Sequence, residues 1–348
     1  MKKLISQNVK NARVLKGISQ QELADIIGVS KQMISKYEKG ESIPASTNFL
    51  KLGKALNVKM DYFFKQAKID LGVLSFRKKS SFSNKKKSSL EQLLKLKLEN
   101  YLEIEKLLQI DYSFNNLIKD HKIESIDDIE KVVLQLRNEW QIGIDPLHNI
   151  IQLLEDNEIK VVELYDVDDS FDGLATFAND KFPIIVVNGN FTVERKRFTL
   201  LHELGHLLLN LPECDIKEEE NFCNKFAAEF LLSKKSVINE FGIKRDSISL
   251  NEFIEVQKKY GISIQAIVYR LVDAGIYTSN QQAGFYKKIN SNPSLKEQIN
   301  VERFQTPEVS NRFEQLVYRA LSQEIISMSK ASSLLNLNIN TLLENSLL

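Results

Sequence analysis

The chain of 348 residues is long enough for two or three domains, and its composition, 43% hydrophobic and 27% charged, is that of an ordinary globular protein. No apolar run reaches the roughly 18 residues of a membrane span, and the N-terminal residues lack the apolar core of a signal peptide. Two cysteines, Cys214 and Cys223, are too few for a disulfide framework. We therefore expect a cytoplasmic protein with no membrane association.

The charges are segregated along the sequence. Residues 1–87 carry 19 Lys and Arg against 6 Asp and Glu, a net charge of +13, whereas residues 88–348 carry 28 against 40, a net charge of −12. A basic end joined to an acidic remainder is typical of a nucleic-acid-binding module attached to a second function.

Residues 5–65 contain short apolar blocks at helical spacing, separated by glycines. One helix is predicted from Gln20 to Ile27, and Gly28 suits the left-handed residue that ends a helix. Ser30 can cap a second helix that extends to about Lys39. Helix, glycine-containing turn and helix together predict a helix-turn-helix.

The stretch SQQELADIIGVSKQMISKYEKG (19–40) resembles the XRE (Cro/C1-type) DNA-binding family. The resemblance implies that the second helix enters the major groove of double-stranded operator DNA, where Gln and Lys suit base edges and phosphates. The alternative is a helical bundle that binds protein. XRE proteins often bind DNA as dimers, so a homodimer is expected. By position, base edges would face Lys31, Gln32 and Lys36 with Ser35 nearby, and phosphates would face Gln20, Ser30 and Lys39.

The segment FRKKSSFSNKKKSS (76–89) carries six positive charges between Arg77 and Lys87 and no acid. Its Ser and Lys content predicts a flexible linker, which either adds phosphate contacts or is a solvated hinge. A helix is predicted from Ser88 to about Ile110. Its apolar stripe would pack on the rest of the chain or on a second copy, and consists of Leu90, Leu94, Tyr101, Ile104 and Leu108.

Two helices and a small sheet are predicted next. Capping signals predict one helix over about 125–140 and a second, begun by the Asp145–Pro146 pair, over about 145–156. β-Branched residues are dense in IKVVELY (159–165) and FPIIVVN (182–188), which predict strands. Between them, SFDGLATFAND (170–180) is a candidate for a third or edge strand.

The stretch RFTLLHELGHLLLN (197–210) inverts the usual pattern of a surface helix. Apolar residues cover most of its circumference, and one narrow stripe is polar: Thr199, His202, Glu203, His206 and Asn210. A buried ionisable group without a partner costs on the order of several kcal/mol, and a divalent metal removes that cost. Histidines at i and i+4 can reach one Zn²⁺, and Glu203 can act as general base and then general acid. This is the H-E-x-x-H metallopeptidase motif.

Two histidines leave a tetrahedral site incomplete, and the other two histidines lie upstream in polar surroundings. A second helix is predicted over KEEENFCNKFAAEFLLS (217–233). Glu220 on this helix is a candidate third ligand, and spacing alone does not exclude Glu218 or Glu219. Asn224, one turn further on, is a candidate to hydrogen-bond a ligand from outside the coordination sphere.

Residues 172–232 resemble the ImmA/IrrE family of metallo-endopeptidases through FPIIVVNGN, ERKRFTLLHELGHLLLN and E-x-x-C-N-x-F-A-A-E-F-L-L. The family usually shows E-x-x-A-N-x-F-A-A in the last element, so the resemblance implies that Glu220 is the metal-binding glutamate. Cys223 stands where Ala is common, and Ser233 where Pro usually follows, but neither replaces a ligand. The resemblance covers about residues 120–280 and implies a zinc cofactor, with manganese as a substitute, and a protein substrate.

Tyr269 and Arg270 are candidate donors to the developing oxyanion, because zincins commonly place such a donor opposite the general base. The alternative is a packing tyrosine and a structural arginine. Arg195 and Arg197, just before the metal-binding stretch, are expected to bind carboxylates or helix ends.

These features predict an α+β protein. Its four segments are an all-α helix-turn-helix domain (1–68), a basic linker with a connecting helix (69–118), a zincin-like metallopeptidase domain with a small sheet (119–280) and a helical C-terminal segment (281–348). We expect the tail of the last segment, residues 312–348, to pack on, or regulate, the peptidase region.

The predicted function is a nucleoid-associated transcriptional regulator with zinc-dependent endopeptidase activity. The expected substrate is a transcriptional repressor, or the chain's own linker near Lys85, cut in a stress, DNA-damage or mobile-element response. The alternative is a DNA-binding repressor whose peptidase-like domain is a non-catalytic sensor or partner-binding module.

Overall fold

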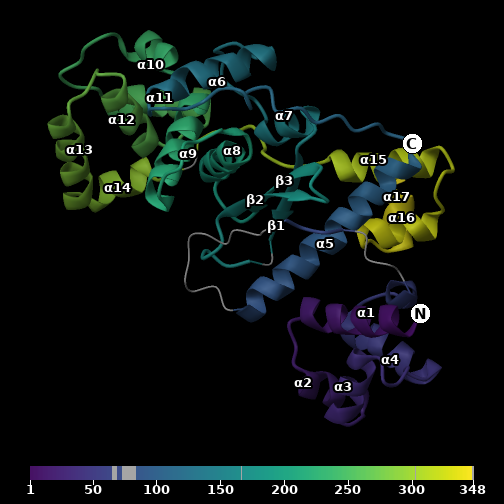
Figure 1. The fold of residues 1–348 in the computed structure, drawn as a ribbon. Helices are drawn as coiled ribbons and strands as arrows, with labels where there is room; N and C mark the ends of the chain where they lie inside the picture. The colour runs from purple at the N-terminus through teal and green to yellow at the C-terminus, as the bar shows by residue number, and fades with distance from the viewer. Residues whose placement is uncertain (65–68, 73–83, 166, 302, 347–348) are drawn as a thin grey trace. The chain divides into compact units, whose positions relative to one another are not determined.

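The computed structural model describes residues 1–64, 69–72, 84–165, 167–301 and 303–346 (Figure 1). Of the predicted flexible linker (76–89), residues 76–83 therefore lie outside the described residues. The prediction is wrong for residues 84–89, which are helical. The chain divides into a first unit, Met1–Leu71, Phe76–Asp111 and Asn311–Leu348, and a second unit, Gly72–Ser75 and Tyr112–Ser310. This division does not decide the four domain boundaries predicted from the sequence, which stay a prediction.

The basic end of the chain folds as a helical bundle with a core of its own. Its apolar side chains, among them Leu23, Ile34 and Leu52, are fully buried. Burying each such side chain contributes roughly 1.5–3 kcal/mol. The bundle consists of α1 (Lys2–Leu15), α2 (Gln20–Ile27), α3 (Lys31–Lys39), α4 (Ser46–Leu56) and a 3₁₀ helix, η1 (Met60–Phe64).

Local signals determine the helix-turn-helix. At the start of α2, the backbone N–H of Ser19 donates to the carboxylate of Glu22 at 2.6 Å, and the N–H of Glu22 donates to the Ser19 hydroxyl at 3.1 Å. Gly28 ends α2 with a φ of 74°, a left-handed conformation that glycine adopts without steric penalty. Ser30 caps α3 by accepting from the N–H of Met33 at 3.2 Å. Both helices begin and end where the sequence predicts.

A long helix, α5 (Asn84–Leu107), belongs to the same unit. The sequence left open whether its apolar stripe packs on the chain itself or on a second copy. In the structure Leu90, Leu94, Tyr101 and Ile104 are all at most 5% exposed, so this stripe is buried within the chain. Helix α1 packs against α5.

The C-terminal helices pack against α5, and this corrects the prediction that they pack on the peptidase-like region. Tyr101 and Ile104 of α5 share a core with Val317, and Lys330 forms an ion pair with Glu103 at 2.5 Å. The sequence could not identify this partner, because Glu103 and Lys330 are 227 positions apart. The three helices are α15 (Arg312–Ser322), α16 (Met328–Leu335) and α17 (Ile339–Ser346).

The described part of the second unit contains a three-stranded sheet: β1 (Lys160–Leu164), β2 (Gly173–Ala178) and β3 (Phe182–Asn188). β3 is central, because it pairs with β1 in parallel and with β2 in antiparallel. The β2–β3 connection passes through Asn179 and Asp180, whose φ angles of 52° and 53° are left-handed values that these residue types tolerate. The candidate third strand of the sequence is thus β2, and it lies at an edge.

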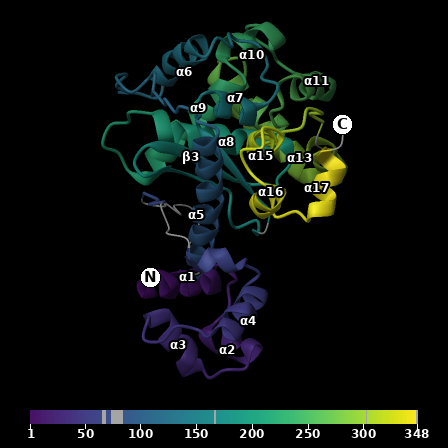
Figure 2. The ribbon, with the colours of Figure 1, turned by 90° about the vertical axis from the view of Figure 1, so that its right-hand side faces the viewer.

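Two helices pack against the sheet, and the other helices of this unit extend its larger core (Figures 1 and 2). Mixed helices and a small sheet confirm the α+β class. In the part of the chain that the structure describes, none of the helices has the length and apolarity to cross a membrane. The helices are α6 (Asp128–Glu139), α7 (Ile150–Asp156), α8 (Val193–Leu208), α9 (Ile216–Leu231), α10 (Lys234–Phe241), α11 (Leu250–Tyr260), α12 (Ile264–Asp273), α13 (Ser279–Ser291) and α14 (Pro293–Ile299).

One predicted helix start is wrong. The sequence predicted that Asp145 and Pro146 begin a helix, but Asn149 caps α7, accepting from the N–H of Gln152 at 2.9 Å. Arg137 is 2% exposed and donates to the carbonyl of Asp145 at 2.6 Å. This bond from a buried arginine holds the segment before α7 in a loop, and a capping signal does not reveal such a tertiary contact.

Candidate metal centre and helix-turn-helix interface

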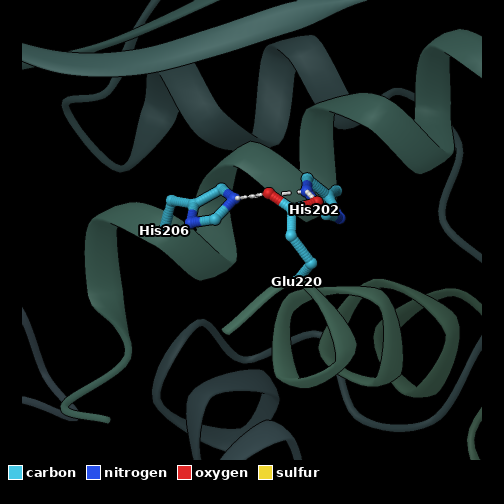
Figure 3. A group of neighbouring side chains, drawn as sticks. All are labelled: His202, His206 and Glu220. Atoms are coloured by element: carbon cyan, nitrogen blue, oxygen red, sulfur yellow. Dashed lines mark hydrogen bonds and ion pairs between the residues drawn. The ribbon is translucent and has the colours of Figure 1, made fainter. Parts of the chain in front are cut away.

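Three polar side chains from two helices meet inside the second unit (Figure 3). Helix α8 carries His202 and His206, and α9 carries Glu220. The Nε2 atoms of the two histidines are 3.2 Å apart. The two carboxylate oxygens of Glu220 are divided between them: Oε2 lies 3.4 Å from Nε2 of His202, and Oε1 lies 3.4 Å from Nε2 of His206. The structure therefore brings together the three residues that the sequence predicted as metal ligands.

The two helices approach closely because a glycine lies between the histidines. A Cβ atom at Gly205 would come within 3.3 Å of both the Cα and the Sγ atom of Cys223 on α9. A larger residue would therefore push the helices apart. On the other side, Leu200, Leu201 and Leu204 are fully buried and fix which face of α8 turns toward α9.

The donor atoms fit a tetrahedral zinc ion. With zinc–ligand bonds of about 2.0–2.1 Å, two ligands of a tetrahedron lie roughly 3.3–3.4 Å apart. The two Nε2 atoms are 3.2 Å apart, each has a different oxygen of Glu220 at 3.4 Å, and one ligand atom from each of the three residues lies within 4.8 Å of the others. Two imidazole nitrogens and one carboxylate oxygen are also a donor set of catalytic zinc sites, which keep a fourth position for water or substrate. The residues present thus satisfy both the chemistry and the spacing of such an ion.

Glu203 lies next to this set without being one of its three members. Its side chain is buried, at 9% exposure, and its charge helps to raise the pKa of His206. The Cγ atom of Glu203 lies close to Gly173, the first residue of β2. If Gly173 carried a side chain, its Cβ atom would lie 3.2 Å from this Cγ atom and 2.9 Å from the methyl carbon of Thr199. Gly173 therefore allows the edge strand to reach this face of α8.

The second ring nitrogen of His206 contacts other groups. Its Nδ1 atom lies 3.1 Å from Oε1 of Glu219 and 3.4 Å from Sγ of Cys223. Burial lowers the pKa of His206, but the hydrogen bond with Glu220 and the charges of Glu203, Glu220 and Glu219 outweigh it, so the pKa is raised. The environment of this histidine is thus strongly anionic.

The predicted partner Asn224 does not take part in this arrangement. It is exposed on α9, and its side chain makes no hydrogen bond to the described residues. Glu219 instead contacts His206, although the sequence suggested Glu219 only as a competing ligand. Adjacent residues of a helix point about 100° apart, so Glu219 and Glu220 reach different sides of the same imidazole ring.

The two candidate oxyanion donors are not brought to the metal-binding set. Arg270 is fully buried and forms ion pairs with Glu229 and Asp273. Glu229 follows Glu220 by nine residues on α9, which is about 13 Å along the helix. Tyr269 is 45% exposed, and no described interaction links it to the set. These ion pairs favour the alternative in which Arg270 is a structural arginine rather than an oxyanion donor.

A buried ion pair anchors α8 ahead of the histidines. Arg197 and Glu308 are both 0% exposed at their side chains and lie 2.7 Å apart. Arg197 also donates to the carbonyl of Leu147 at 2.8 Å. Burial lowers the pKa of Arg197 and raises that of Glu308, and each partner opposes the shift of the other. Arg197 thus binds a carboxylate, as the sequence suggested.

The candidate DNA contacts lie on α3 and near the turn before it. Lys31, Gln32, Lys36 and Lys39 are exposed, and Ser35 is half-buried. Exposed side chains on one short helix can reach a groove without disturbing the core of the bundle.

Two further residues predicted near phosphates already have partners. The amide of Gln20 donates to Glu38 at 2.7 Å, and Glu38 pairs with Arg13 at 2.5 Å. The hydroxyl of Ser30 accepts from the N–H of Met33. Both residues retain polar atoms, but their positions are held by contacts within the bundle.

Two family models match the chain in separate regions. A helix-turn-helix model matches residues 9–63, and a peptidase-family model described as an IrrE N-terminal-like domain matches residues 157–272. The second match includes the sheet, α8 and α9.

The curated relatives match only a short part of this chain. The SPbeta prophage-derived HTH-type transcriptional regulator YonR of Bacillus subtilis is 36% identical over 20% of this chain and 65% of its own length. An HTH-type transcriptional regulator of Rickettsia prowazekii is 37% identical over 17% of this chain and 46% of its length. The chain thus spans less than two thirds of either relative.

The chain covers nearly the whole length of a third relative. The HTH-type transcriptional regulator YgzD of Bacillus subtilis is 35% identical over 17% of this chain and 91% of its own length. Among solved structures, the apo form of ComR from S. thermophilus aligns over 97% of this chain and 92% of that chain. At a TM-score of 0.18 and 11% identity, this alignment does not show a shared fold. The chain therefore belongs to the helix-turn-helix family of transcriptional regulators, and it joins this XRE-type domain to an IrrE-like domain of a metallopeptidase family.

Proposed function

We propose that the chain is a DNA-binding transcriptional regulator whose IrrE-like domain is a zinc-dependent endopeptidase. The observation that carries the proposal is the meeting of His202, His206 and Glu220 at separations of 3.2–3.4 Å, with buried Glu203 beside them. A domain that only packed or sensed would not need three metal-binding donors directed at one point together with an adjacent carboxylate.

His202, His206 and Glu220 would hold the ion. When bound, zinc supplies Lewis-acid chemistry, which polarises a peptide carbonyl and makes water acidic enough to react at neutral pH. The carboxylate of Glu203 would take the proton that water loses in the attack and deliver it to the leaving amine. Glu203 is only 9% exposed and its Cγ atom lies beside Gly173 of β2, which limits the access of bulk water to this carboxylate.

The helix-turn-helix domain would bind double-stranded operator DNA through α3. Three facts support this: the net charge of +13 in residues 1–87, the exposure of Lys31, Gln32 and Lys36, and the family to which this region belongs. We expect two copies to bind two half-sites, and the DNA target places the protein on the nucleoid, in the cytoplasm.

The substrate would be an extended protein segment, either a repressor that shares the operator region or this chain itself. Edge strands bind extended peptides by adding a strand, and β2 is the edge strand beside Glu203. Its carbonyl at Phe177 already accepts a hydrogen bond from the N–H of Gly72 at 3.0 Å. A segment of this chain thus already pairs with the β2 edge, but Lys85 lies within α5, so a cut near Lys85 would require the first turn of this helix to unwind.

The test uses the full chain and its Glu203→Gln variant, each purified with Zn²⁺ or Mn²⁺. We expect the wild-type chain to yield a defined fragment by intact-protein mass spectrometry, and the variant to stay whole. In parallel, new protein N-termini are compared between cells that express either form, which reports cleavage of any other protein, whatever its identity.

The outcomes separate the two versions of the proposal. A fragment with a cut in the linker supports self-cleavage, whereas new N-termini in another protein support a repressor as the substrate. If neither appears in any condition although zinc is bound, the peptidase proposal is wrong and a non-catalytic sensor domain is the remaining interpretation.

A further inference from the structure

The Nδ1 atom of His206, which points away from the other candidate ligands, contacts Glu219. The inference drawn from this contact rests on the proposed function. The Nε2 atom of this histidine faces His202 and Glu220, so its Nδ1 atom points the opposite way. A carboxylate oxygen of Glu219 lies 3.1 Å from Nδ1, within hydrogen-bond distance. The Glu219 side chain is 25% exposed, so this contact is partly shielded from water.

The contact determines which ring nitrogen carries the proton. An ionised carboxylate accepts hydrogen bonds and cannot donate one, so a bond between Nδ1 and Glu219 requires a proton on Nδ1. In the neutral ring the other nitrogen then presents a lone pair. That nitrogen is Nε2, the atom that faces the two other candidate ligands.

We propose that Glu219 is a positioning residue for zinc: it holds His206 in the Nδ1-protonated tautomer and directs the Nε2 lone pair at the metal. Glu219 and Glu220 are adjacent on α9, so one short stretch of helix supplies both a ligand and the partner that orients another ligand. A carboxylate in this position also makes the imidazole a stronger donor, and loss of such a partner typically weakens metal binding by about 10–100-fold.

The neighbouring thiol does not replace this carboxylate. Cys223 lies 3.4 Å from the same Nδ1 atom, but a thiol is a weak acceptor and carries no charge in its protonated form. Glu218 is the natural control, because it is exposed on the same turn of α9 and its removal changes the net charge by the same amount.

The first experiment measures the zinc affinity of the full chain by competition with a chromogenic chelator. We expect Glu219→Gln to bind zinc about 10–100-fold more weakly than the wild-type chain. Glu219→Asp, which retains a carboxylate, should recover part of the loss. Glu218→Gln should stay within about threefold, because an exposed charge is screened by solvent and salt.

The second experiment uses only the wild-type chain, so its result does not depend on whether a variant folds. In ¹⁵N-histidine-labelled wild-type chain loaded with zinc, NMR of the ring nitrogens should show His206 protonated at Nδ1 and metal-bound at Nε2. A proton on Nε2 of His206, or equal zinc affinities for Glu219→Gln and Glu218→Gln, would overturn the inference. If instead the wild-type chain binds no zinc at all, the proposed function itself fails.

Discussion

In the helix-turn-helix domain the candidate residues Lys31, Gln32 and Lys36 are exposed on α3, whereas in the IrrE-like domain His202 and Glu203 are buried. Exposed polar groups are already solvated, so their removal changes binding to a partner more than it changes stability. Buried polar groups must be satisfied inside the protein, so their removal affects the fold and the site together. Substitution of a polar residue is therefore expected to have different consequences in the two regions.

The largest expected effect is loss of zinc when a candidate ligand is removed. His206→Ala should weaken zinc binding by more than about 100-fold, because a ligand contributes more than the outer partners whose loss costs about 10–100-fold. His121→Ala, at an exposed histidine, should bind zinc like the wild-type chain. The zinc content of each variant after dialysis measures both effects. Equal zinc content in the two variants would contradict the proposed site.

The next largest effect is on stability, at the buried ion pair that anchors α8. Glu308→Ala leaves the charge of Arg197 buried without its carboxylate, and should cost about 3–5 kcal/mol. Glu255→Ala removes an exposed partner of Lys258 and should change stability by less than about 0.5 kcal/mol.

Urea unfolding followed by the fluorescence of Trp140 measures this pair of variants. Trp140 is the single tryptophan of the chain, and its ring packs 5.8 Å from that of Phe230, so its emission reports on the second unit. Similar midpoints for both variants would show that the Arg197–Glu308 pair is not a stabilising anchor.

A smaller effect is expected at the exposed face of α3, the predicted DNA-contacting face. Lys36→Ala should weaken binding to DNA selected by the wild-type chain by about 1–3 kcal/mol if Lys36 contacts a base, or reduce the salt slope by about 1 if it contacts a phosphate. Lys54→Ala, at an exposed position of α4, removes the same charge from outside the predicted interface. Fluorescence anisotropy at two salt concentrations distinguishes the cases. An equal loss for both lysines would indicate general charge attraction rather than recognition by α3.

The smallest expected effect is the pH dependence of the α2 cap. The backbone N–H and then the hydroxyl of Ser19 hydrogen-bond the Glu22 carboxylate and lower its pKa below 4.5. A lowered carboxylate pKa stabilises the folded state above the unfolded pKa, and this contribution is lost as the pH falls through the folded pKa. A ¹³C NMR titration should therefore give Glu22 a pKa below 4.5, and Glu22→Gln should flatten the acid dependence of α2 stability. An ordinary Glu22 pKa would mean that the capping box is not formed in solution.

Features that depend on residues close together in the sequence could be predicted in both regions. The helix-turn-helix follows from neighbours in the sequence, such as Ser19 with Glu22 and the left-handed Gly28, so its boundaries were predicted correctly. The spacing of His202 and His206 is also local, because residues four apart lie on one face of a helix.

The remaining features depend on contacts between distant residues. The rotation of α9 decides which of its first glutamates meets His206, and it depends on the packing of Gly205 against Cys223. The anchor of Arg197 lies 111 positions away at Glu308. The burial of Arg270 with Glu229 and Asp273, which argues against an oxyanion role, is likewise a tertiary contact.

The central claim is that His202, His206 and Glu220 hold one zinc ion, and a crystal structure of the zinc-loaded chain tests it most directly. Anomalous scattering at the zinc edge should show one strong peak about 2.0–2.2 Å from both Nε2 atoms and from the Glu220 carboxylate. A peak instead at the other acidic group, formed by Glu130, Glu229 and Asp273, or no peak in zinc-loaded crystals, would contradict this claim.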